Sequence, residues 1–219
     1  MTDSGNVDAR ILPMFPLGSV ALPGVGLPLQ VFEPRYRALV MTSLSSDRLF
    51  GSVLIERGSE VGGGDQRNSL GTLIRIIDAK EDVNGHWFVT GVGIERLRVH
   101  EWLEDDPFPR AVVNSWPDTP NDADTGHLVE LARMLCLEVR ERTGSVFEFQ
   151  KIIDLLDPDP SVGSFQLLAL SPLGPSDHYR GLCASTASER LEFLCESLKE
   201  QLTDLDAIDA LHRRESSGE

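Results

Sequence analysis

Residues that could do chemistry are sparse in this chain, and they are not spaced for catalysis. Its 219 residues include five histidines, but no H-x-x-x-H or H-E-x-x-H pair that would hold a zinc ion. No G-x-x-x-x-G-K-[ST] loop could cradle a nucleotide phosphate, and no G-x-S-x-G turn could present a nucleophilic serine. The sequence therefore predicts no catalytic residue, no metal site and no cofactor. We expect the chain neither to hydrolyse ATP nor to cleave casein.

Charged residues that could act in binding flank a proline. Glu33 and Arg35 lie on either side of Pro34, where they form either a structural ion pair at a helix start or a polar anchor at a binding groove. Glu95–Arg96 allows the same two interpretations. Nearby apolar side chains are either core residues or the lining of that groove. The candidate peptide-binding residues are therefore Leu22, Phe32, Glu33, Arg35, Tyr36 and Arg96.

The stretch from Met14 to Leu44 must position most of these residues. Met14–Leu17 and Leu27–Phe32 are short apolar runs typical of strands, and their prolines place them at a sheet edge or at bulges. Pro34 suits the first position of a helix, and apolar residues follow it at helical spacing. We therefore expect a strand, a loop, a second strand and a helix that packs on the sheet.

Two aromatic residues of this stretch have different expected positions. Phe32, at the end of a strand, is expected to cover the open end of a barrel, so that truncation to alanine destabilises the protein strongly. Tyr36 is expected near the rim, with a smaller effect, because its hydroxyl requires a polar partner or water.

Further short strands are expected between residues 49 and 113. Asn84–Gly85 predicts a tight turn between two of them, and Gly91–Gly93 predicts a bend or bulge. Leu97 and Val99 alternate with Arg96 and Arg98, as in a half-buried strand. The glycine-rich segment Glu56–Ser69 predicts a long mobile loop. The expected strands, which favour a small barrel, are Leu49–Ile55, Leu70–Lys80, Trp87–Val92, Leu97–Val99 and Ala111–Val113.

The second half of the chain predicts helices. Pro117–Asp124 is a polar linker, and Thr186-x-x-Glu189 predicts a capping box for the last helix. Apolar stripes indicate the other helices at Leu128–Val139, Phe147–Leu156, Ser161–Leu170 and Ser176–Ala184. The expected fold class is α+β, with a flexible tail at 1–10, a β-barrel subdomain at 11–117 and an α-helical subdomain at 125–214.

Charge and cysteine usage limit the partners and the compartment. The net charge of −15 is concentrated in Pro117–Glu219, which holds 9 basic and 20 acidic residues against 11 and 15 in Met1–Trp116. Such a surface repels phosphate backbones and disfavours nucleic acid. No apolar run spans a bilayer and no secretory signal is recognisable, so no membrane association is expected. Three cysteines without a C-x-x-C pair indicate reduced thiols and a cytoplasmic location.

A known family resembles this sequence. Phe15–Tyr36 reads F-P-L-x-x-V-x-L-P-G-x-x-L-P-L-x-V-F-E-P-R-Y, which resembles the start of the substrate-binding N-terminal domain of the Lon proteases. G-T-L-I-x-I at Gly71–Ile76 and G-V-G-I-E-R-L-R-V at Gly91–Val99 are similar to the next blocks of that family, and Ala169–Asp177 is similar to a link between its helices. The resemblance implies a PUA-like β pseudo-barrel followed by a C-terminal helical bundle.

The resemblance also implies a function. We expect a non-catalytic module that binds unfolded or extended protein segments and works as a monomer or weak dimer, without the ATPase and peptidase parts of a Lon protease. A separate protease is a second candidate partner. Two alternatives stay open: an RNA-binding protein, which the barrel type favours and the acidic charge disfavours, and a hydrolase with an unrecognised site.

Overall fold

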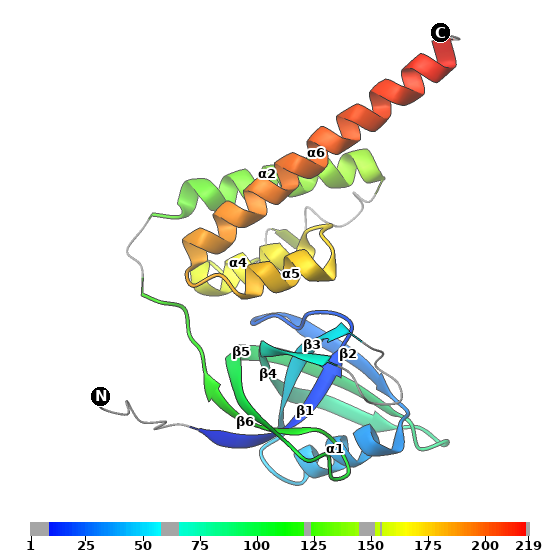
Figure 1. The fold of residues 1–219 in the computed structure, drawn as a ribbon, viewed down its shortest axis with the longest axis vertical. Coiled ribbons are helices and arrows are strands. Elements are labelled where there is room, and N and C mark those ends of the chain that lie inside the picture. Colours follow the sequence, from blue (N-terminus) through cyan, green and yellow to red (C-terminus); the bar gives the residue numbers. More distant parts are fainter. Residues whose placement is uncertain (1–8, 58–65, 121–123, 145–151, 154, 218–219) are drawn as a thin grey trace. The chain divides into compact units, whose positions relative to one another are not determined.

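Two compact units make up the chain in the computed structural model: Met1–Pro117, here the strand unit, and Asp118–Glu219, here the helical unit. The structure describes residues 9–57, 66–120, 124–144, 152–153 and 155–217 (Figure 1). Within these residues the strand unit contains six strands and helix α1, and the helical unit contains helices α2, α4, α5 and α6. The predicted α+β fold class is confirmed.

The strand unit is built around a ring of paired strands. These strands are β1 (Arg10–Leu17), β2 (Gly26–Val31), β3 (Leu49–Arg57), β4 (Gln66–Glu81), β5 (Trp87–Leu103) and β6 (Arg110–Ser115). β1 pairs with β3 in parallel, the pairs β3–β4, β4–β5 and β5–β6 are antiparallel, and β6 pairs back onto β1. β2 lies outside this ring and, among the described strands, pairs only with β5.

Apolar side chains are buried on both faces of this sheet. Met14 and Phe15 are neighbours in β1 but belong to different clusters, because successive side chains of a strand point to opposite faces. The cluster of Met14 draws on all five ring strands and fills the ring. The cluster of Phe15 packs against α1 (Pro34–Leu44), which contributes Tyr36, Leu39 and Val40. The second cluster therefore holds α1 against the sheet.

Two predicted features of the strand unit are confirmed. The turn at Asn84–Gly85 joins β4 to β5, and Gly85 adopts the left-handed backbone conformation with φ of 77°. The expected bulge near Gly91–Gly93 is present as a register shift that leaves Ile94 without a partner in β4. Glycine without a Cβ is needed at Gly93 itself, where an added Cβ would collide with the carbonyl oxygen of Leu22.

The predicted bounds of the loop Glu56–Ser69 are wrong at both ends. β3 continues to Arg57 and β4 begins at Gln66, because both segments extend the β3–β4 ladder beyond the apolar runs that marked it. Residues 58–65 lie outside the described residues. The expected tail also ends earlier than predicted, since Arg10 already pairs with Val113, and residues 1–8 lie outside the described part of the chain.

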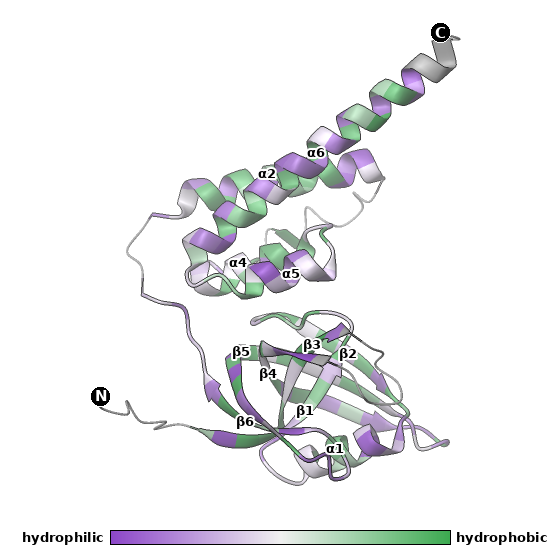
Figure 2. Cartoon of the chain, viewed as in Figure 1, coloured by the Kyte–Doolittle hydropathy of each residue, from purple (hydrophilic) through white to green (hydrophobic). Residues whose placement is uncertain are grey.

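The helical unit consists of α2 (Gly126–Thr143), α4 (Pro160–Leu170), α5 (Pro175–Leu182) and α6 (Ala187–Ser217). α2 and α6 lie side by side (Figure 1), and apolar and polar residues alternate along α6 (Figure 2). The predicted capping box is confirmed, because Glu189 N–H donates to Thr186 Oγ1 at 3.1 Å and Ser185 N–H donates to Glu189 Oε2 at 2.8 Å. The predicted helix Phe147–Leu156 lies largely outside the described residues.

The cysteines of the helical unit pack as apolar side chains. Cys136 and Cys195 are buried and unpaired. Burial raises the pKa of the Cys136 thiol to about 12, so this thiol stays protonated at neutral pH and is a poor nucleophile. No helix in the described part of the chain is long and apolar enough to cross a membrane.

Candidate functional site

The strand unit has a groove where β2 leads into α1. Its volume is about 230 Å³. The end of β1, the following loop, β2 and the first turn of α1 supply its ten lining residues, which are Phe15, Leu17, Ser19, Pro28, Leu29, Gln30, Val31, Phe32, Glu33 and Tyr36. Glu33 is the one carboxylate among these residues, and none of them is a histidine, lysine or arginine. A lining of this kind can receive apolar side chains, but it offers no pair of groups for acid–base chemistry.

Tyr36 and Phe15 form the rigid part of the groove. Their rings stack with centroids 4.1 Å apart and planes 10° from parallel. Tyr36 is only 3% exposed, so the expected position near the rim is wrong. The reason is helical geometry: α1 begins at Pro34, and residues 36, 39 and 40 then lie on the face that packs on the sheet.

Phe32 lines the same groove from an exposed position. Its side chain is 52% exposed, so the expectation that it covers the end of a barrel as a core residue is wrong. Val31, the last residue of β2, points into the core, and strand alternation turns the next side chain outward. Phe32 is therefore free to contact a ligand without leaving a packed position.

Glu33 and Arg35 form the ion pair that the sequence allowed. Arg35 Nε lies 3.2 Å from Glu33 Oε2, and both side chains are mostly buried. The Arg35 guanidinium also lies 4.4 Å from the centroid of the Tyr36 ring, an arrangement that favours a cation over an aromatic face. Glu33 reaches the groove, and Arg35 holds both Glu33 and Tyr36 in place.

Leu22 and Arg96 do not line this groove. Leu22 is buried in the loop that crosses Gly93. Arg96 is only 2% exposed and its guanidinium lies 4.1 Å from the ring centroid of Trp116. The expected outward position of Arg96 on a half-buried strand is therefore wrong, since β5 is covered on both faces at this point. The structure brings together four of the six candidates.

The remaining lining residues were not among those candidates. Pro28 is the member that the sequence could have indicated, because a proline inside a strand marks an edge strand with accessible backbone. Leu17 is one of the apolar residues that the sequence assigned either to the core or to the groove, whereas Phe15 lines the groove only through its packing against β2 and α1. That contact joins segments distant in sequence, and no local pattern predicts it.

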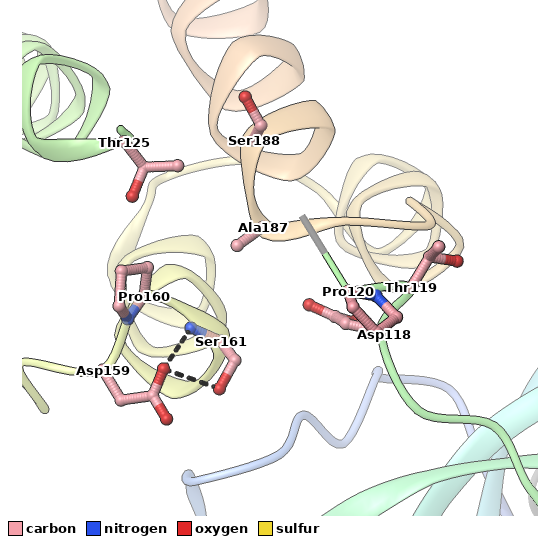
Figure 3. Close-up of a pocket in the computed structure, with 9 residues that line it drawn as sticks. All are labelled: Asp118, Thr119, Pro120, Thr125, Asp159, Pro160, Ser161, Ala187 and Ser188. Carbon is pink, nitrogen blue, oxygen red and sulfur yellow. Dashed lines mark hydrogen bonds between the residues drawn. The ribbon is translucent and has the colours of Figure 1, made fainter. Parts of the chain in front are cut away.

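A second pocket lies within the helical unit (Figure 3). It has a volume of about 280 Å³ and is lined by the first residues of α4 and α6, by Thr125 before α2 and by the segment Asp118–Pro120. Helix N-termini attract anions, but here aspartate carboxylates of the chain itself accept bonds at the starts of two helices. Asp159 accepts bonds from the N–H and hydroxyl of Ser161, and Asp124 accepts from Gly126 N–H. This pocket therefore has no clear chemical role.

The serine–histidine contact between Ser171 and His178 is structural. Ser171 Oγ and His178 Nε2 lie 3.4 Å apart, but Ser171 is buried and its hydroxyl donates to Leu168 O at the end of α4. Burial lowers the pKa of His178. Among the described residues, no three His, Cys, Asp or Glu side chains gather as a metal site would require.

Comparison with known proteins identifies the chain's relatives. The family model for the ATP-dependent protease La (LON) substrate-binding domain matches residues 11–200. Lon protease 2 of Myxococcus xanthus is 30% identical over 111 residues, which make up 50% of this chain and 13% of that protein. The chain thus spans only a small part of the length of this relative.

Two solved structures share the fold. The Lon N-terminal domain protein from Xanthomonas campestris is 27% identical with a TM-score of 0.59, over 84% of this chain and 96% of that one. The N-terminal domain of Mycobacterium avium complex Lon protease is 18% identical with a TM-score of 0.66, over 87% of this chain and 98% of that one. The family model matches most of the chain, and this chain therefore belongs to the Lon substrate-binding domain family.

Proposed function

We propose that this chain recognises unfolded or extended segments of other proteins through the groove beside Phe32, and that it performs no catalysis itself. The observation that carries the proposal is an exposed aromatic side chain next to a groove that combines apolar side chains with polar groups, in a domain of a substrate-binding family. An exposed aromatic ring at the side of a groove is suited to protein contact, because burying it on binding is favourable.

The groove suits side chains of a polypeptide better than a compact small molecule. Its volume of about 230 Å³ is below the range of roughly 300–1,000 Å³ that is usual for small-molecule pockets. Its carboxylate, Glu33, is already paired with Arg35. Apolar segments of unfolded proteins offer what such a surface can bury, and folded proteins keep those segments inside.

Nucleic acid is the less favourable ligand. The net charge of −15 opposes association with a phosphate backbone, and the groove lining contains no lysine or arginine. A delivery role toward a separate protease in the cytoplasm is compatible with this proposal, and the buried thiols of Cys136 and Cys195 fit a reducing compartment.

Truncating Phe32 tests the proposed groove. We expect Phe32→Ala to stay folded and to bind a fluorescently labelled, carboxymethylated unfolded polypeptide about tenfold more weakly, because a hot-spot aromatic contributes upward of about 1–2 kcal/mol. Fluorescence anisotropy titration measures the affinity. Met41→Ala is the matched control, since Met41 is 57% exposed on α1 but does not line the groove.

If the wild type and Phe32→Ala bind the polypeptide with equal affinity, the groove beside Phe32 is not the binding site. A loss of the same size in Met41→Ala would show that any exposed apolar side chain contributes. Binding of RNA that weakens steeply with added salt, without polypeptide binding, would favour the nucleic-acid alternative.

A further inference from the structure

β2 has one strand edge that no described strand uses. It pairs with β5 from Gly26 to Val31, while the ring β1–β3–β4–β5–β6 closes without it. The other edge of β2 therefore presents backbone donors and acceptors that no described strand takes up. Such an edge is a template on which an extended chain can add as a further strand.

The sequence of β2 itself supplies few of the devices that protect strand edges. Natural proteins blunt exposed edges with lysine or other charged side chains, with proline or with coverage by another element. Gly26–Val31 reads G-L-P-L-Q-V, so it contains no charge, and Pro28 is its one protective residue. Proline removes a single N–H and leaves its carbonyl oxygen as an acceptor.

Side chains beside the edge favour an uncharged, apolar occupant. Phe32 follows β2 directly, lines the groove and is 52% exposed. The one carboxylate of the groove, Glu33, is paired with Arg35. A charged segment would lose hydration here without gaining a partner, whereas leucine, valine or phenylalanine would bury apolar surface against the Phe32 ring.

We propose that an extended, uncharged segment of a client protein adds to the free edge of β2 as a new strand, with aliphatic or aromatic side chains at alternate positions directed to the groove. This inference rests on the proposed function and specifies its mode. Backbone hydrogen bonds supply affinity with little dependence on sequence, and the groove selects the alternate side chains. Many unrelated unfolded segments can then be recognised by one site.

Backbone-modified peptides test this mode. The probe is a short synthetic peptide in which leucine alternates with threonine, labelled with fluorescein. Two further versions carry N-methyl groups on alternate residues, one on the leucines and one on the threonines. A strand pairs through the N–H groups of only one of its edges. We therefore expect one methylated version to bind at least about tenfold more weakly and the other to bind like the parent.

Hydrogen exchange of the protein provides the second measurement. On binding of the parent peptide, amides of β2 should exchange about tenfold more slowly, while those of β6, which lies between two strands, should not change. Equal binding of all three peptides, equal losses from both methylation patterns, or unchanged exchange in β2 would each overturn strand addition and leave the proposed function standing. If neither the parent peptide nor the unfolded polypeptide binds, the proposed function itself fails, and this inference fails with it.

Discussion

Truncation of Tyr36 to alanine is expected to lower the free energy of unfolding by about 3–5 kcal/mol, the range found for buried aromatic residues. Tyr36 is 3% exposed, stacks on Phe15 and lies in the cluster that joins α1 to the sheet. Its removal leaves a cavity between these elements. Because a typical domain has only about 5–15 kcal/mol of stability, the variant should be marginal, as urea unfolding followed by tryptophan fluorescence would show.

Phe32→Ala is the matched control for this prediction. Phe32 is an aromatic residue four positions away, but it is 52% exposed, so its truncation should change the free energy of unfolding by no more than about 1 kcal/mol. The pair separates packing from binding within one segment: Tyr36 supports the groove and Phe32 contacts the ligand. A Tyr36→Ala protein that unfolds at the same urea concentration as the wild type would contradict the stacked, buried position of Tyr36.

The expected order of these two effects is the reverse of the order that the sequence indicated, and the reason is local geometry. The sequence correctly predicted that a strand ends before Pro34 and that α1 begins there. The direction of the Phe32 side chain depends on which face of β2 is buried. β2 has only six residues, and two of its leucines are half-exposed, so its sequence does not reveal the buried face. Once Val31 is known to be buried, the outward position of Phe32 follows.

Arg96 illustrates a second limit. Alternation in β5 assigned Leu97 and Val99 to the core and Arg96 to solvent, and the core assignment is confirmed. Arg96 is nevertheless buried, because the indole of Trp116, which follows β6, covers its guanidinium. Contacts between segments distant in the chain decide this burial, and they also decide the parallel pairing of β1 with β3. The periodicity of a sequence reflects only the local structure and does not indicate such distant contacts.

The sequence indicated that β2 is an edge strand, but it did not show which residues line the groove beside it. Prolines in both apolar runs indicated edge strands or bulges, and Pro28 does lie in a strand with one unpaired edge. Pro16 in β1 gave the same local indication, yet β1 lies between β3 and β6. The groove arises from the packing of β1, β2 and α1, so its lining could not be assembled from any one of these segments.

Replacing Arg190 with alanine is expected to destabilise the helical unit by about 3–5 kcal/mol, the cost of breaking a buried ion pair. Arg190 is fully buried in α6. Its Nη2 lies 2.7 Å from Asp118 Oδ1, its Nη1 donates to Ser164 Oγ at 2.6 Å, and its guanidinium lies 3.3 Å from the centroid of the Phe165 ring. Removal of the side chain takes away the Arg190 partner of the Asp118 carboxylate, which is only 17% exposed. It also opens a cavity beside Phe165.

Arg142 provides the control, because it has similar bonds in a different environment. Its guanidinium binds Asp206 at 2.8 Å and Asp209 at 2.7 Å, and both carboxylates are largely exposed. Water and salt replace such pairs readily, so Arg142→Ala should lower the free energy of unfolding far less than Arg190→Ala. Urea unfolding followed by far-ultraviolet circular dichroism, which reports the helices, measures both variants at low and high salt.

Two further variants separate charge from packing at Arg190. Asp118→Asn keeps the shape of the carboxylate but removes its charge, so the double variant Arg190→Ala with Asp118→Asn should recover part of the loss, since no carboxylate is then left unpaired. Arg190→Lys should recover little, because an ammonium group cannot reach Asp118, Ser164 and the Gly181 carbonyl together while lying flat on Phe165. If Arg190→Ala and Arg142→Ala instead unfold at the same urea concentration, Arg190 contributes no more than a surface ion pair, and the helical unit must depend on its leucine packing alone.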